Sequence, residues 1–238
     1  SINTKKSGLE SAARNARYNI FKKALQKNDQ LLMAHHADDV AETVLYRLFR
    51  GTGIDGLQGP VKKRALGEGV IIRPWLDYTK AELSEYLSDH NIDFVHDDTN
   101  FEDNQDRNFI RNEVLKTTFN RWPNASKQIQ KTADLVFRHK HVHDFLIEKQ
   151  FGENIKGSKL QRKFLLDLDE ETCSEIIRFW IKANNFAMPN KKIIGEILKA
   201  FIFSNPSPKT QVNWSRADND QKSAFLTFSN GDLILNDK

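Results

Sequence analysis

The 238-residue chain is long enough to bury the core of one large domain or two ordinary ones without crosslinks. Cys173 is its only cysteine, which excludes an internal disulfide and a paired-cysteine zinc or redox site, and we expect it to be a buried, reduced thiol. No apolar run approaches the roughly 20 residues of a membrane span, so we expect a cytoplasmic protein without membrane contact.

Charge is distributed unevenly along the chain. The net charge is +4, and residues 121–163 carry ten basic side chains against four acidic ones. Such a stripe suits a polyanion such as RNA, although a solvated helix face has the same composition.

Helix and strand patterns alternate in the first half of the chain. Apolar residues at helical spacing predict a helix over 10–25, and the apolar run at 30–34 predicts a short buried strand. A second helix is expected to run to about Arg50 and to end at Gly51 as its C-terminal cap. At its start, Asp39 and Glu42 have the spacing of a capping box.

A second strand is expected over 69–73, and Thr79 with Glu82 opens a helix that continues through His90. Strands that alternate with helices indicate a parallel α/β sheet. The segment 97–108 is polar and irregular, and it leads into a helix that carries Arg107 and Arg111 one turn apart on one face.

Helices dominate the second half. Pro123 indicates a domain border, which is followed by a long helix over 124–150 and then by a smaller unit with helices near 170–184 and 189–203. A terminal β-hairpin is expected to turn at Asn230-Gly231. Trp180 and Trp214 are expected in the core.

Five ionisable residues gather where the first strand meets the second helix: His35, His36, Asp38, Asp39 and Glu42. Ligands of a parallel sheet bind beyond the carboxyl ends of the strands, where this cluster is expected. Two aspartates exceed the need of one helix cap, and their mutual repulsion requires a cation. Zinc, Mg²⁺ with a nucleotide, and the ammonium of an amine substrate all remain open from the residues alone.

Four stretches of the sequence occur in a recognisable order. They are ESAARNARY (10–18), HHADDVAETVLYRLFRGTGIDGL (35–57), IRPWL (72–76) and DDTNFEDNQDRNFIRNEVL (97–115). Through them the chain closely resembles the tRNA(Ile)-lysidine synthase family, a branch of the PP-loop ATP pyrophosphatases. The second half resembles the central tRNA-binding domain of that family in position, length and basic character.

The resemblance implies a fold and a domain order. We expect an α/β, parallel-sheet catalytic domain of PP-loop type (adenine nucleotide alpha hydrolase-like) over 1–122. A connecting helix over 123–150 would lead to a smaller, mostly helical tRNA-binding-type domain with a terminal β-hairpin over 151–238.

A reaction is implied as well. ATP, with Mg²⁺, adenylates C2 of the wobble cytidine in a tRNA(Ile) with a CAU anticodon, and free L-lysine then displaces AMP to form lysidine, which changes decoding from AUG to AUA. A lysine substrate brings an ammonium that carboxylates hold, and an adenylated intermediate brings negative charge that arginines stabilise.

Matching positions supply the expected site residues. Catalytic roles fall to Asp39, Glu42, His35, Asp38 and Arg107. Substrate and nucleotide contacts fall to Asp39, Glu42, Arg14, Arg107, Asn108 and Arg111. The expected tRNA-binding residues are Arg121, Lys127, Lys131, Arg138 and Lys140. No metal ligand is assigned, and a homodimer remains open.

One departure from the family pattern limits these expectations. The SGGxDS nucleotide loop of the family does not occur in this sequence, so we expect an N-terminally truncated enzyme that is inactive by itself. Two alternatives from other classes are a non-catalytic tRNA-binding module and a zinc-dependent hydrolase that uses the HHADD cluster.

Overall fold

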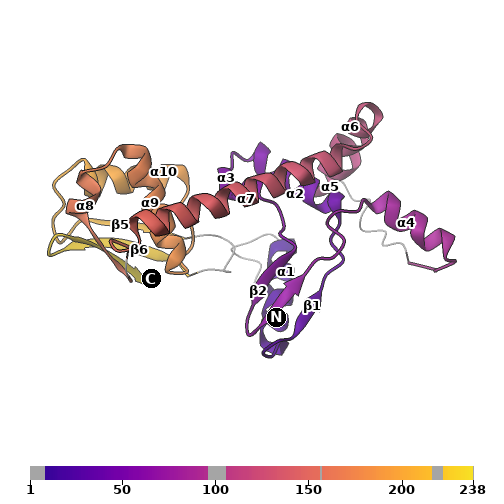
Figure 1. Cartoon of the computed structure of the whole chain (residues 1–238), viewed down its shortest axis with the longest axis horizontal. Coiled ribbons are helices and arrows are strands. Elements are labelled where there is room, and N and C mark those ends of the chain that lie inside the picture. The colour runs from indigo at the N-terminus through magenta and orange to yellow at the C-terminus, as the bar shows by residue number, and fades with distance from the viewer. Residues whose placement is uncertain (1–8, 96–105, 156, 216–221, 238) are drawn as a thin grey trace. The chain divides into compact units, whose positions relative to one another are not determined.

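The chain divides into two compact units (Figure 1). The computed structural model describes residues 9–95, 106–155, 157–215 and 222–237. The first unit comprises residues 20–141, and the second comprises the described parts of residues 1–19 and 142–238. Helices α1 (Leu9–Ala24) and α7 (Ala125–Phe151) run across the division, and both confirm predicted helices. The predicted domain borders at 123 and 151 stay predictions.

A three-stranded sheet lies in the first unit. Its strands are β1 (Gln30–Leu32), β2 (Lys63–Leu66) and β3 (Gly69–Ile72), in the order β1-β3-β2. β1 and β3, the two predicted strands, pair in parallel as expected, whereas β2 is an additional strand that pairs antiparallel with β3. Sequence patterning misses β2 because it is an edge strand with three exposed residues in four and no apolar run.

Six helical segments complete the description of the first unit besides α1 and α7: α2 (Ala37–Phe49), α3 (Ile54–Leu57), α4 (Lys80–Asp89), α5 (Asp106–Phe109), the π-helical η2 (Ile110–Leu115) and α6 (Lys116–Arg121). Gly51 follows α2 with φ +71°, a left-handed conformation that glycine adopts without strain, which confirms its predicted capping role. The predicted start of α4 at Thr79 is also confirmed, and it is a capping box, because the Thr79 hydroxyl accepts from the Glu82 N–H and the Glu82 carboxylate accepts from the Thr79 N–H.

The polar segment before α5 is only partly described. Residues 97–105 of the predicted irregular stretch lie outside the described residues. Residues 106–108 are helical, which corrects the expectation that the irregular stretch extends to Asn108. Because α5 begins at Asp106 and continues into η2, both Arg107 and Arg111 lie on helical backbone.

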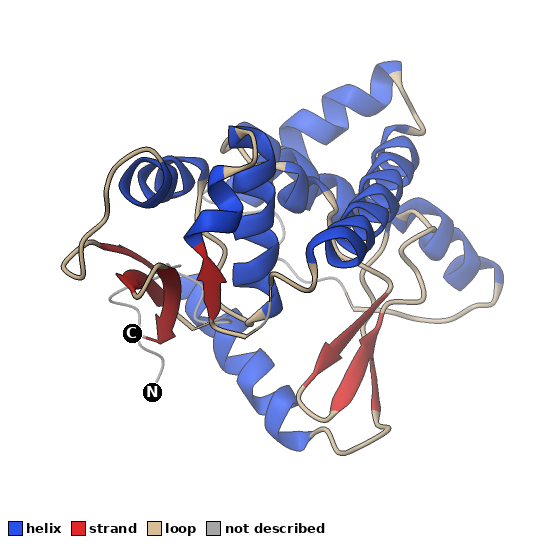
Figure 2. Ribbon diagram, turned by 60° about the vertical axis from the view of Figure 1, so that its left-hand side comes forward, coloured by secondary structure: helices blue, strands red, loops and turns tan. Residues whose placement is uncertain are grey.

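The second unit packs helices against a four-stranded antiparallel sheet (Figure 2). The strands are β4 (Lys159–Gln161), β5 (Gln211–Trp214), β6 (Ala224–Ser229) and β7 (Asp232–Asp237), in the order β4-β7-β6-β5. The helical segments are α8 (Arg162–Leu166), α9 (Glu170–Ala183), α10 (Lys191–Ile197) and the π-helical η3 (Leu198–Ile202). The predicted hairpin turn is confirmed by positive φ at Asn230 and Gly231, but its two strands form the centre of a larger sheet.

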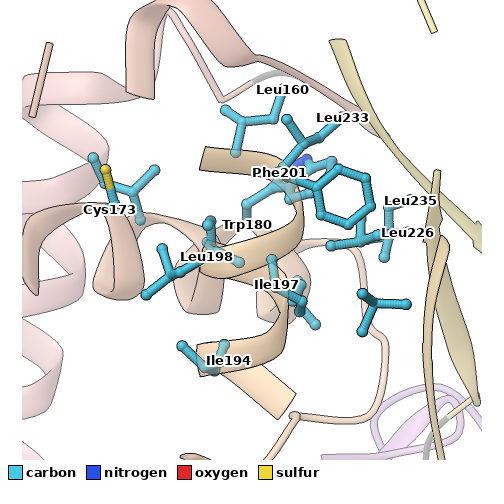
Figure 3. Packing of buried hydrophobic residues seen from close by; sticks show 14 of the residues in the cluster. Leu160, Cys173, Trp180, Ile194, Ile197, Leu198, Phe201, Leu226, Leu233 and Leu235 are labelled. Carbon is cyan, nitrogen blue, oxygen red and sulfur yellow. The ribbon is translucent and has the colours of Figure 1, made fainter. Parts of the chain in front are cut away.

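Large apolar side chains from α9, η3 and the sheet fill the core of the second unit (Figure 3). Trp180 and Trp214 are buried as predicted, and the Trp180 indole donates to the Gly157 carbonyl at 2.8 Å. Cys173 is buried as expected, and burial raises the pKa of its thiol. None of the described helices is both long and apolar enough to traverse a bilayer.

Candidate functional site

The ionisable cluster lies where the carboxyl ends of two parallel strands adjoin. β1 ends at Leu32 and β3 ends at Ile72, and these two residues are paired. His35 follows β1 and Arg73 follows β3, and the Arg73 Nε donates to the His35 Nδ1 at 3.3 Å. Because Arg73 is buried and also donates to the Val61 carbonyl at 2.8 Å, it fixes the turn that carries the cluster.

The start of α2 differs from the predicted capping box. His36 is the N-cap, and the Asp39 carboxylate accepts from the His36 N–H at 2.9 Å. The predicted pairing of Asp39 with Glu42 is therefore wrong, because the helix begins three residues earlier and Glu42 lies inside it. Both pairs have the same three-residue spacing, so spacing alone does not distinguish them.

Glu42 and Arg111 form a bidentate ion pair. The Arg111 Nε donates to the Glu42 Oε1 at 2.6 Å, and its Nη2 donates to Oε2 at 2.8 Å. The Glu42 side chain is 4% exposed and that of Arg111 is 34% exposed. Burial raises the pKa of Glu42 and Arg111 opposes that rise, while the bond to Glu42 raises the pKa of Arg111. The pair therefore places a fixed guanidinium beside the second turn of α2.

Arg107 reaches the same helix from α5. Its Nη2 donates to the Thr43 hydroxyl at 3.3 Å, one residue from Glu42. Arg107 and Arg111 thus approach α2 from one face, as their spacing predicts. Asn108 between them is partly buried.

Asp38 is bonded to the first turns of two other helices. Its Oδ2 accepts from the Lys80 N–H of α4 at 2.7 Å, and its Oδ1 accepts from the Ser126 hydroxyl of α7 at 2.5 Å. The Asp38 side chain is 17% exposed, whereas that of Asp39 is 25% exposed. The two neighbouring aspartates therefore differ in their surroundings.

The five basic residues that are expected to bind tRNA differ in their exposure to solvent. Arg121, Lys131 and Arg138 are exposed, but Lys140 is buried, and Lys127 donates to Glu82 at 2.5 Å. The burial of Lys140 disagrees with a solvent-facing contact to tRNA. Arg14 lies on α1, where its guanidinium covers the Tyr18 ring at 4.9 Å.

Three residues of the site are absent from the sequence-based assignment: Thr43, Arg73 and Ser126. Arg73 belongs to the IRPWL stretch, and a lone arginine directly after a buried strand is a signal that points to it. Thr43 and Ser126 carry no such signal, because a hydroxyl in a helix has many ordinary roles.

Comparison with known proteins agrees with this geometry. A family model described as a PP-loop domain matches residues 1–118, and one described as the TilS substrate binding domain matches residues 160–220. A tRNA(Ile)-lysidine synthase of Coxiella burnetii is 38% identical over 202 residues, which are 83% of this chain and 45% of the relative. Synthases of the same name from Legionella pneumophila (strain Lens) and Haemophilus influenzae (strain 86-028NP) are each 32% identical, over 87% and 96% of this chain and 48% and 54% of the relatives.

The chain belongs to the tRNA(Ile)-lysidine synthase family. This confirms the resemblance that the four sequence stretches indicate. The chain spans about half the length of the curated relatives it matches. The carboxylate cluster, Arg107 and Arg111 all fall within the PP-loop match, whereas Ser126 lies between the two matched regions.

Proposed function

We propose that the protein containing this chain is a tRNA(Ile)-lysidine synthetase. It would adenylate C2 of the wobble cytidine of a tRNA(Ile) with a CAU anticodon and then join free L-lysine to that carbon through a new C–N bond. The observation that carries the proposal is the family membership together with a site that places carboxylates and arginines side by side.

The geometry supports different roles for the two acidic residues expected at the lysine site. Asp39 is partly exposed, and a partly exposed carboxylate suits a lysine ammonium. Both oxygens of Glu42 already accept from Arg111, so we propose that Glu42 acts through that guanidinium. Arg111 would then face an anion, either the lysine carboxylate or a nucleotide phosphate.

Arg107, Asn108 and Arg14 are proposed for the phosphates of ATP or of the tRNA backbone. Arg107 lies one turn from Arg111 on the face that meets α2, so the two guanidinium groups can act on the same developing negative charge. His35 is proposed to position the turn through its bond to Arg73.

ATP binding follows from the PP-loop match. For Mg²⁺ the donor set fits an ion that the nucleotide carries, because Mg²⁺ takes one or two carboxylates and fills its other positions with phosphate oxygens and water. Asp39 is the partly exposed carboxylate that fits this use. Within the described ranges, no group of three or more His, Cys, Asp or Glu side chains is arranged to hold a metal ion. The ion would neutralise phosphate charge during adenylation.

The tRNA would contact exposed basic residues on α6 and α7. We propose Arg121, Lys131 and Arg138 for phosphate contacts, because their side chains are exposed. Lys127 is a weaker candidate since it already bonds Glu82, and the buried Lys140 is the weakest. The match to a TilS substrate binding domain over 160–220 supports a substrate-binding role for the second unit.

The ligase is favoured over the two alternatives. The cluster carboxylates accept hydrogen bonds from a guanidinium, a hydroxyl and backbone N–H groups, which is unlike a set of zinc ligands. Each relative compared above carries the name of a synthase, which also argues against a module without catalysis.

The decisive experiment measures ATP-dependent incorporation of labelled lysine into tRNA(Ile) with a CAU anticodon. The natural protein, expressed from its own gene, is compared with residues 1–238 alone and with Asp39→Asn in the natural protein. A tRNA with another anticodon is the substrate control. We expect incorporation by the natural protein and a raised KM for lysine in Asp39→Asn. No incorporation into the CAU tRNA would overturn the proposal.

A further inference from the structure

The first turns of three helices converge on one carboxylate. Asp38 lies in the first turn of α2, Lys80 begins α4, and Ser126 is the second residue of α7. The backbone N–H of Lys80 is one of the four that an α-helix leaves unpaired at its start, and the Asp38 carboxylate satisfies it. Helix N-termini also attract an anion through their dipoles.

The two hydrogen bonds hold each oxygen of the Asp38 carboxylate in a defined direction, and the His36 Nδ1 lies 3.5 Å from Oδ2. Hydrogen bonds from neutral donors to a carboxylate are stronger than those between neutral groups. Ser126 is 1% exposed, and a buried hydroxyl without its acceptor is costly. The Asp38–Ser126 bond therefore joins residues 88 positions apart with little freedom for either side chain.

Asp38 and Asp39 project differently because neighbouring residues of a helix are about 100° apart around its axis. Asp38 points to α4 and α7, whereas Asp39 turns back to the His36 N–H at the start of its own helix. Asp38 and Asp39 lie in the same first turn of α2, and Glu42 lies in the next turn. The bonds from Lys80 and Ser126 to Asp38 therefore also affect the directions in which Asp39 and Glu42 project.

We propose that Ser126 and Asp38 are a positioning pair, in which the Ser126 hydroxyl holds the Asp38 carboxylate so that the first turn of α2 presents Asp39 to the lysine substrate. This proposal rests on the proposed function and deepens it. Asp38 is then a positioning residue rather than a ligand of lysine, and Ser126 acts on lysine binding from a position outside both family matches.

The test is a lysine titration of the natural protein at saturating ATP and tRNA(Ile), with Ser126→Ala as the central variant. We expect a rise of about tenfold in the KM for lysine, since one lost charge-assisted bond corresponds to roughly that factor, with kcat and the KM for ATP changed by less than about twofold. In Asp38→Asn combined with Ser126→Ala, the KM should equal that of Asp38→Asn alone.

A matched control comes from the next turn of α7. Gln130 is buried and donates to Asp77 at 3.2 Å and to Asp134 at 3.1 Å, so it also ties α7 to its surroundings without touching the cluster. Gln130→Met is expected to lower the melting temperature about as much as Ser126→Ala and to leave the KM for lysine unchanged. A KM for lysine that Ser126→Ala leaves unchanged, or that Gln130→Met raises equally, overturns the proposal.

A second measurement is independent of activity. Backbone amides of residues 37–42 should exchange hydrogen faster in Ser126→Ala than in the wild type, and at the wild-type rate in Gln130→Met. Unchanged exchange in Ser126→Ala refutes the positioning pair. A wild-type protein that incorporates no lysine refutes the proposed function, and this exchange experiment still decides whether Ser126 holds the turn.

Discussion

Replacing Arg111 by methionine tests the electrostatics of the site most directly. Arg111→Met keeps much of the aliphatic stem and removes the guanidinium that pairs with both oxygens of Glu42. Removing one partner of a fully buried pair costs roughly 3–5 kcal/mol, because the other charge stays buried. Since the Arg111 side chain is 34% exposed and water screens it in part, we expect about 2–3 kcal/mol at pH 7.5.

The cost should depend on pH with a definite sign. Burial already raises the pKa of Glu42 in the folded protein, and loss of Arg111 raises that pKa further. Between the unfolded value of 4.5 and the raised folded value, the folded state binds more protons than the unfolded state. The variant therefore loses stability as pH rises through this window, and the gap to the wild type should be smaller at pH 5 than at pH 7.5.

Urea unfolding at the two pH values measures both quantities. Lys62→Met is the matched control, because it breaks the Lys62–Asp77 pair, whose side chains are 54% and 49% exposed, and it should cost less than about 1 kcal/mol. Adding Glu42→Gln to Arg111→Met should recover part of the loss, since the buried charge is gone. If Arg111→Met costs no more than Lys62→Met, or costs equally at both pH values, the buried-pair argument is refuted.

Three further outcomes are expected. The bonds from Lys127 and Thr79 hold the pKa of Glu82 at about 2, so its stabilising effect should be complete above pH 4.5 and fade as pH falls toward 2. Urea unfolding at pH 7, 5 and 3 should show that the difference in unfolding free energy between wild type and Glu82→Gln becomes smaller as pH falls. Trp180→Phe removes the indole bond to Gly157 from a fully buried site and should cost roughly 1–3 kcal/mol in calorimetry, whereas an unchanged melting temperature contradicts that bond. Replacing Lys131 and Arg138 together by glutamine should lower the slope of log K against log salt for tRNA binding by about 1 to 2, and an unchanged slope would argue against phosphate contacts there.

Local chemistry accounts for the parts of the fold that the sequence predicts well. The Thr79 cap of α4, the glycine after α2 and the Asn230-Gly231 turn each depend on residues within a few positions of one another. β2 escapes prediction because an exposed edge strand has no apolar pattern, and its pairing to β3 is decided by the tertiary structure.

The candidate site is likewise predicted from the sequence only where it depends on residues close together in the chain. The sequence predicts that charged residues gather after β1 and that Arg107 and Arg111 share a face, because both depend on local periodicity. It does not predict that Asp38 meets Ser126, since that contact joins residues 88 positions apart and a serine carries no signal for it. Only the fold determines which of the two adjacent aspartates bonds to other helices.

The balance of charge at the start of α2 supports a cationic ligand. Asp38, Asp39 and Glu42 are three carboxylates, whereas Arg111 pairs with Glu42 and Arg107 reaches Thr43 beside it. Asp38 accepts from Lys80 and Ser126 at the N-termini of α4 and α7, whose dipoles favour an anion. Asp39 accepts from the His36 N–H and has the His36 Nε2 at 3.5 Å, and it is the more exposed of the two aspartates. We therefore propose Asp39 as the carboxylate that would accept the ammonium of an amine substrate, since Glu42 and Asp38 are already engaged by Arg111 and by α4 and α7.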